Sequence, residues 1–183
     1  AHIVGCSQGG RIALDLALAD PDRVASLLLV APAVSGAPEP ALDSQTARLA
    51  AAIEAAEAAN DVDAVNELEA QVWLDGPAGP AGRVVGAARA LFLDMNGKAL
   101  RSPPAGDVEE PAPAWNKLEE VRCPVWVLWG DLDLPHVKSR CERLVKRIDG
   151  ARRVVLACGF MLAVDERSPH LGTAGGGRKW QFS

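Results

Sequence analysis

Two apolar runs separated by a helical pattern constrain the fold of this chain more than any other feature of its sequence. The first run ends at Gly5, residues 8–19 place apolar side chains at helical spacing, and residues 26–31 form a largely continuous apolar run. Such a run is typical of a strand covered on both faces of a parallel sheet. Strand, helix and strand within about 30 residues make a βαβ unit. The sequence therefore predicts an α/β fold in which the helix over residues 8–19 is largely buried.

The composition changes after Pro32. Residues 36–113 are rich in Ala, Glu, Pro and Gly and contain no good strand pattern. Within them, Asn60-Asp61 supplies a helix stop followed by a new N-cap. We expect a helical insertion here, which is either a cap over a substrate site or a subdomain with no part in binding. Its predicted helices span residues 41–59, 62–72 and 84–95.

Strand patterns return after the insertion. One apolar run ends at Gly130 and another covers residues 153–157, with an amphipathic helix predicted over residues 137–148 between them. The chain end is rich in Gly and has no apolar periodicity, so we expect it to be flexible. The sequence therefore predicts a core formed by residues 1–35 and, after a helical insertion over residues 36–113, by residues 114–169. A tail follows over residues 170–183.

Composition and charge exclude several classes of protein. The chain is 49% hydrophobic and 23% charged, as in a folded globular domain rather than a disordered one. Acidic residues outnumber basic ones by 24 to 19, which argues against a nucleic-acid partner. No apolar run approaches the roughly 20 residues that cross a bilayer, so no membrane partner is expected. The 4 cysteines form no C-x-x-C pair; this predicts no metal site and favours a reducing, cytoplasmic location.

The motif with the clearest chemical meaning lies between the first predicted strand and the first predicted helix. Gly5-Cys6-Ser7-Gln8-Gly9 matches the G-x-S-x-G pattern of a nucleophile elbow. Such a sharp turn strains the central residue and needs glycines on either side to avoid clashes. The Ser7 hydroxyl would project over the positive end of the following helix, where the N–H of Gln8 could bind a developing oxyanion. The alternative is a chance match in a Gly-rich turn.

The surroundings of this motif resemble a known family. Residues 2–10, 19–24 and 27–30 are similar to the elbow region of single-domain α/β-hydrolases, above all the bacterial esterases, enol-lactonases and C–C hydrolases with a helical cap. The similarity extends from residue 1 to about residue 169. In that family the nucleophile follows strand five, the cap strand six, the acid strand seven and the histidine strand eight.

The resemblance implies a fold and a class of chemistry. The fold would be a three-layer α/β-hydrolase sheet that is partial, lacking the first strands, with a helical cap insertion. The substrate would be a small molecule, with no cofactor and no metal. Haloalkane dehalogenases and epoxide hydrolases of this fold use an Asp nucleophile, so Ser7 argues against those two activities.

The acid of the family has a counterpart in this chain. Residues 123–133 resemble strand seven and the turn after it, and the family places its acid three residues after the glycine that ends the strand. The resemblance therefore implies that Asp133 orients a histidine and stabilises the imidazolium formed when Ser7 loses its proton. Asp131 is the alternative acid, although a turn or capping role explains it better.

The histidine of the family has no such counterpart. Phe160 occupies the position after the last strand, and phenylalanine cannot act as the general base for Ser7. The other candidates are His2 at the far end of the elbow strand, His136 in a loop or helix start, and His170 in the tail. Two functions therefore stay open. One is a serine hydrolase acting on a carboxylic ester, lactone or related carbonyl compound, and the other is a non-catalytic, truncated or degenerate relative.

Overall fold

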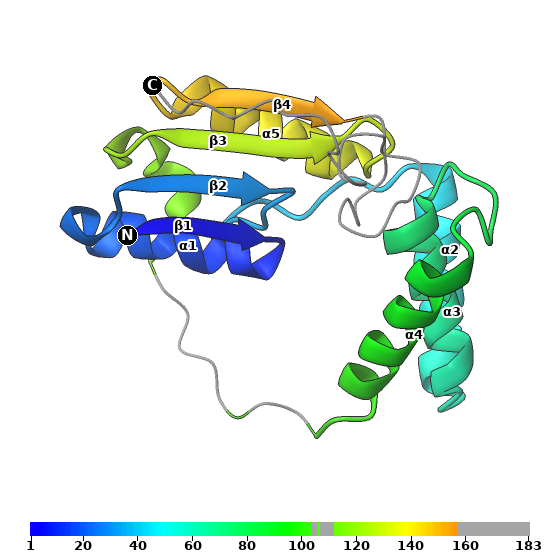
Figure 1. The fold of residues 1–183 in the computed structure, drawn as a ribbon. Coiled ribbons are helices and arrows are strands. Elements are labelled where there is room, and N and C mark those ends of the chain that lie inside the picture. The colour runs from blue at the N-terminus through cyan, green and yellow to red at the C-terminus, as the bar shows by residue number, and fades with distance from the viewer. Residues whose placement is uncertain (104–105, 107–111, 157–183) are drawn as a thin grey trace, which may run out of the picture.

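The centre of the molecule is a parallel sheet (Figure 1), seen in a computed structural model that describes residues 1–103, 106 and 112–156. All neighbouring strands are parallel, and their order across the sheet is their order along the chain. The α/β fold predicted from the βαβ pattern is therefore confirmed. The strands are β1 (His2–Cys6), β2 (Ser26–Val30), β3 (Val125–Gly130) and β4 (Arg152–Leu156).

Helices on one face of the sheet enclose the main hydrophobic core. Their inward side chains pack against the odd-numbered residues of the central strands, of which Leu27, Leu29 and Val127 are fully buried. The helix that follows β1 stops at Asp20-Pro21 as predicted, because proline cannot continue a helix. The elements of this layer are α1 (Gln8–Ala19), η1 (Pro21–Arg23), η3 (Ala114–Asn116), η4 (Leu118–Glu120) and α5 (Pro135–Arg147).

α1 is less buried than its apolar composition predicts. Leu14 is fully buried, but Ile12 is 68% exposed and Leu16 is 40% exposed. β1 lies at the edge of the sheet, so α1 covers it with one stripe only and has no described neighbour on its far side. The expectation of a largely buried helix is therefore wrong, because it treated every apolar position of α1 as a packing position.

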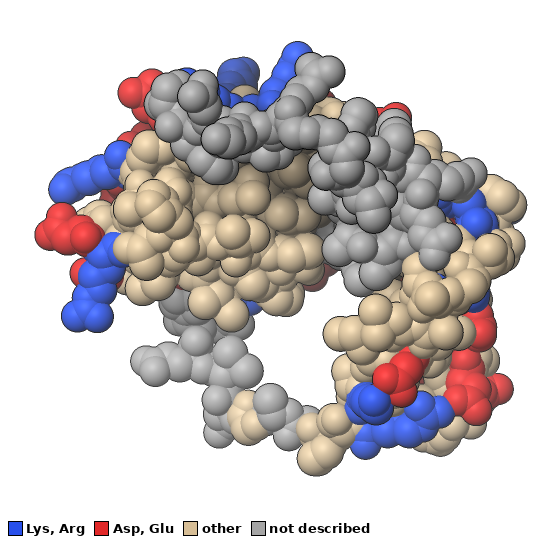
Figure 2. All heavy atoms as spheres, in the orientation of Figure 1, with Lys and Arg blue, Asp and Glu red and all other residues tan. Residues whose placement is uncertain are grey.

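The even-numbered strand residues point to the opposite face of the sheet, on which the described part of the chain places no helix. The strand register aligns Val4, Leu28 and Trp126 on this face. Val4 is 69% exposed, and the other two are half-buried. Figure 2 shows uncharged side chains gathered over β1 and β2 here. The sequence predicts that the strand over residues 26–31 is covered on both faces of the sheet. Among the described residues, helices cover it on one face only.

Residues 36–113 contain helices and, where they are described, no strand, as predicted. Asn60 has a positive φ of 56°, and Asp61 caps the next helix by accepting a hydrogen bond from the Ala64 N–H at 3.0 Å. Figure 1 shows these helices beside the sheet, at the carboxyl ends of its strands. They are α2 (Ser44–Ala58), α3 (Val62–Ala70), the π-helical turn η2 (Gln71–Asp75) and α4 (Gly86–Leu100).

The insertion leaves and rejoins the body of the molecule at one place. A Cβ atom on Gly36 would lie 2.3 Å from the Cβ of Pro113, so the two chain segments touch there. The Ser35 hydroxyl accepts a hydrogen bond from the Ala114 N–H at 2.9 Å and donates one to Asp15 of α1 at 2.5 Å. Both ends of the insertion are thus fixed to α1 through one buried side chain.

Some predictions concern residues that lie outside the described ranges, namely Phe160, His170 and the tail over residues 170–183. Inside those ranges, every helix is too short or too polar to cross a membrane. The same residues contain no group of three or more His, Cys, Asp or Glu side chains arranged to hold a metal ion.

Candidate active site

Ser7 occupies the sharp turn between β1 and α1 with a backbone that few residues other than glycine adopt. Its φ is 50° and its ψ is −118°. The Ser7 N–H donates to the carbonyl of Val30 at 3.0 Å, and its carbonyl accepts from the N–H of Ala33 at 2.9 Å. These two bonds hold the turn against the end of β2. A strained non-glycine residue that is fixed in this way is common at active sites.

Glycines relieve this turn of steric clashes, although not at the two positions that the motif suggests. A Cβ on Gly5 would lie 2.4 Å from the carbonyl oxygen of Gly9, and one on Gly10 would lie 2.6 Å from the Cβ of Pro32. A Cβ on Gly9 itself would meet no atom within 4 Å. The expected need for a glycine is therefore confirmed before Ser7 and wrong for Gly9, because the close approach after Ser7 is made by Gly10.

Gln8 is the first residue of α1, directly after the turn. The first four N–H groups of a helix have no acceptor within the helix, and they lie at the positive end of its dipole. The backbone N–H of Gln8 belongs to this set. It lies one residue after Ser7, at the position expected for an oxyanion donor.

Asp133 is the most unusual ionisable group at this edge of the sheet. It is 3% exposed, and its Oδ2 accepts a hydrogen bond from the Gly130 N–H at 2.7 Å. Its Oδ1 is buried and has no hydrogen-bond partner among the described residues. Burial raises the pKa of Asp133 to about 6, against the lowering effects of the Gly130 N–H and of Lys138. A buried carboxylate oxygen without a partner is well suited to accept a hydrogen bond from a histidine N–H.

Ser7 and Asp133 lie at the same end of the sheet, where the carboxyl ends of its strands are. Ser7 follows β1 and Asp133 follows β3, with β2 between them, so the two turns are separated by two strand spacings of roughly 5 Å each. Burial and then the charge of Asp133 raise the pKa of Cys6, the neighbour of Ser7. The carboxylate is therefore close enough to act electrostatically on the elbow.

Asp131, the alternative acid, lies at this edge with a different environment. Its side chain is exposed, and its N–H donates to the carbonyl of Leu156 at 2.9 Å. This bond ties the turn after β3 to the end of β4. Phe160 follows four residues later and lies outside the described residues.

Neither described histidine forms a hydrogen bond with Ser7 or Asp133. His2 lies at the start of β1, at the opposite end of the strands from Ser7. Its Nδ1 is 2.7 Å from the Ser26 hydroxyl. His136 lies in the first turn of α5, as the sequence suggested, and burial lowers its pKa. The described residues therefore bring together the expected nucleophile, oxyanion donor and acid, without a base.

Comparison with known proteins identifies the family. A model of the alpha/beta hydrolase fold matches residues 1–167. The chain belongs to the α/β-hydrolase fold family. The four parallel strands and the helices on one face are consequently part of an α/β-hydrolase sheet, as the elbow motif suggested. No curated protein matches the chain significantly in sequence.

Solved α/β-hydrolase structures superpose on the chain at low sequence identity. A hydrolase from Pseudomonas aeruginosa matches with a TM-score of 0.60 and 23% identity, over 87% of this chain and 57% of that protein. An esterase from Exiguobacterium antarcticum gives 0.61 and 19%, over 91% and 62%. A 2-hydroxy-6-oxo-6-phenylhexa-2,4-dienoate hydrolase from Rhodococcus gives 0.61 and 23%, over 91% and 59%. The likeness shows the fold, and this chain spans less than two thirds of the length of each protein.

One group of residues was not singled out by sequence reasoning. Arg140, Arg143 and Arg147 lie on one side of α5 and line a cavity with Trp115, away from the elbow. Their spacing of three and four residues is the signal that could have found them, because it places side chains on one face of a helix.

Proposed function

We propose that this α/β-hydrolase is a serine hydrolase that acts on a carboxylic ester, a lactone or a related carbonyl compound. The observation that carries the proposal is the strained turn at Ser7, which stands over the N-terminus of α1 at the sheet edge that also holds Asp133. Ser7 would attack the carbonyl carbon of the substrate, and the Gln8 N–H would bind the oxygen that becomes negatively charged.

Asp133 would serve as the orienting acid of this site. Its buried Oδ1 supports the role, because a histidine N–H would complete the hydrogen bonding of the carboxylate. The substrate class is supported by the structural neighbours, which include an esterase and a hydrolase of a carbonyl compound. We also propose that residues 36–113 act as a cap over Ser7, because Trp73 packs against both the main core and the separate core of these helices.

A specific observation favours a second candidate, a non-catalytic member of the family. Phe160 occupies the sequence position at which the family has its base, and neither described histidine forms a hydrogen bond with Asp133. Loss of one member of a catalytic triad lowers the rate by several orders of magnitude. Such a chain would keep the architecture of the site and would at most bind a substrate there.

Labelling with a fluorophosphonate distinguishes the two functions. For a serine hydrolase we expect the probe to label Ser7, weakly in the parent and strongly in Phe160→His, with no labelling of Ser7→Ala. Hydrolysis of p-nitrophenyl acetate should rise by at least about a hundredfold in Phe160→His, since a general base contributes roughly 10²-fold or more. Cys6→Ala is the matched control and should label like the parent, because Cys6 neighbours the nucleophile without replacing it.

The outcome that contradicts the proposal is equally concrete. If the parent and Phe160→His both show the far-UV circular dichroism of a folded α/β protein and neither is labelled, the serine hydrolase function is wrong and the non-catalytic alternative stands.

A cytoplasmic location is part of the same proposal. It is supported by Cys6, Cys123 and Cys141, which are all free thiols.

A further inference from the structure

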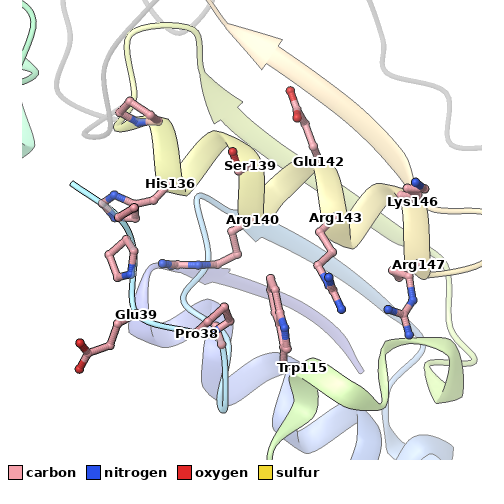
Figure 3. A pocket seen from close by; sticks show the side chains of 14 residues that line it. Pro38, Glu39, Trp115, His136, Ser139, Arg140, Glu142, Arg143, Lys146 and Arg147 are labelled. Carbon is pink, nitrogen blue, oxygen red and sulfur yellow. The ribbon is translucent and has the colours of Figure 1, made fainter. Parts of the chain in front are cut away.

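A cavity lies on the helical side of the molecule, away from Ser7 (Figure 3). Its volume is about 730 Å³, and it is bounded by α5, by Trp115 of η3 and by residues 37–41. Ser7, Gln8 and Asp133 are absent from its lining. Sites for small molecules usually measure about 300–1,000 Å³, so this cavity has room for a ligand of that class.

The lining of this cavity is positively charged, in contrast to the chain as a whole. α5 contributes Arg140, Arg143 and Arg147, and Figure 3 shows these side chains on the side of α5 that faces Trp115 and Pro38. The lining acids do not neutralise them, because Glu39 and Glu142 point away from the guanidinium groups in the same view. Since the net charge of the chain is −5, the cavity is a local exception.

Two of these guanidinium groups have unused hydrogen-bonding capacity. Arg147 forms an ion pair with Glu119. The guanidinium of Arg143 stacks 4.3 Å from the ring centre of Trp115, and its buried Nε has no hydrogen-bond partner among the described residues. Among the described residues, Arg140 donates one bond, to the carbonyl of Pro32 at 3.2 Å. Each guanidinium carries five N–H donors, so both have donors left for an anion.

The state of Arg140 supports the same conclusion. Burial lowers the pKa of Arg140, because a partly buried guanidinium loses part of its hydration. A charge that is partly buried without a counter-ion destabilises the folded protein, and a bound anion would relieve that cost. A negatively charged group that binds in the cavity would therefore be stabilised by Arg140 and Arg143.

We propose that this cavity binds a phosphate monoester with a ring-bearing or otherwise apolar body. A phosphate dianion offers three oxygens and up to two negative charges to two separate guanidinium forks, whereas a carboxylate offers two oxygens and one charge. Trp115, Pro38 and Pro40 provide apolar surface beside the charged groups for the rest of the ligand. The cavity is thus a second ligand site, independent of the hydrolase site.

Calorimetric titration of the 183-residue chain with phenyl phosphate tests this proposal. We expect saturable binding with one site per chain, weakened about tenfold in Arg143→Gln and in Arg140→Gln, because one charge-assisted hydrogen bond contributes roughly that factor. Lys117→Gln removes the same charge from an exposed position outside the cavity and should leave the affinity unchanged. Circular dichroism of each variant separates a lost site from a lost fold.

The proposal is overturned if the folded parent shows no saturable binding, if Lys117→Gln weakens binding equally, or if benzoate binds as tightly as phenyl phosphate. Ser7→Ala keeps the two sites apart. We expect this variant to bind phenyl phosphate with the affinity of the parent. Loss of binding in Ser7→Ala would show that the ligand occupies the elbow instead.

Discussion

Ser7 and Asp133 are both held in states that local physical chemistry disfavours. Ser7 has a positive φ without being a glycine, and Asp133 has a carboxyl group that is almost completely buried. Such features persist only where the surrounding structure determines them, and they concentrate at functional sites. At the scale of single residues, this coincidence at one edge of the sheet is the strongest argument for an active site.

The raised pKa of Asp133 has a consequence for stability. An unfolded Asp has a pKa of about 4, and the folded value is about 6. The favourable contribution of the neutral carboxyl is complete below about pH 4 and is lost as the pH rises through 6. Asp133→Asn removes the ionisation, and we expect it to stabilise the fold by about 2–3 kcal/mol at pH 8 and by little at pH 4.

Urea unfolding of Asp133→Asn at both pH values measures this difference. Asp131→Asn is the control, since Asp131 is exposed and its substitution should change stability by less than about 0.5 kcal/mol. An Asp133→Asn chain that is less stable than the parent at pH 8 would contradict the expectation, because it would mean that the carboxylate stabilises the fold.

The glycines around Ser7 give a second prediction at this scale. Gly5→Ala forces a Cβ against backbone atoms at 2.4 Å and should lower the free energy of unfolding by about 2 kcal/mol or more. Gly9→Ala meets no neighbour within 4 Å and lies in α1, so it should raise stability by roughly 0.5–1 kcal/mol. Thermal unfolding of the two variants checks the pair, and equal effects would show that the turn differs from the one described.

At the scale of elements, the sequence predicted what depends on local interactions. The start of α3 was predictable because Asp61 carries its own capping carboxylate, and the end of α1 because of Asp20-Pro21. The exposure of Ile12 was not predictable in this way. It depends on which strand lies beside β1, and helical periodicity contains no information about the neighbours of a strand.

A matched pair of substitutions in α1 tests this difference between apolar residues. Leu14→Ala should lower the free energy of unfolding by about 2–5 kcal/mol, because Leu14 is fully buried in the main core. Ile12→Ala should change it by less than about 0.5 kcal/mol, because its side chain is 68% exposed. Denaturant titration provides both values. A large loss in Ile12→Ala would mean that another part of the protein covers this side of α1.

At the scale of the whole molecule, the sequence named candidate residues for one site and missed the cavity beside α5. Ser7 and Gln8 could be named from the elbow motif, and Asp133 from the resemblance of residues 123–133 to the family's strand seven. The cavity beside α5 could not, since it is formed by segments that are far apart in the chain, Pro38 from one side and Trp115 from another. Long-range proximity of this kind follows from the tertiary fold and leaves no local pattern.

The attachment of the helical insertion to the body yields the last prediction. Ser35→Ala would leave the buried Ala114 N–H without its side-chain acceptor and Asp15 without its donor. An unsatisfied buried donor costs about 1–3 kcal/mol, so we expect a loss of that size and faster amide hydrogen exchange at Ala114. Ser102→Ala removes an exposed hydroxyl at the end of α4 and serves as the control, with no change in exchange at Ala114. Unchanged exchange in Ser35→Ala would show that Gly36 and Pro113 hold the two ends together without the hydroxyl, since the Pro113 side chain already lies against Gly36.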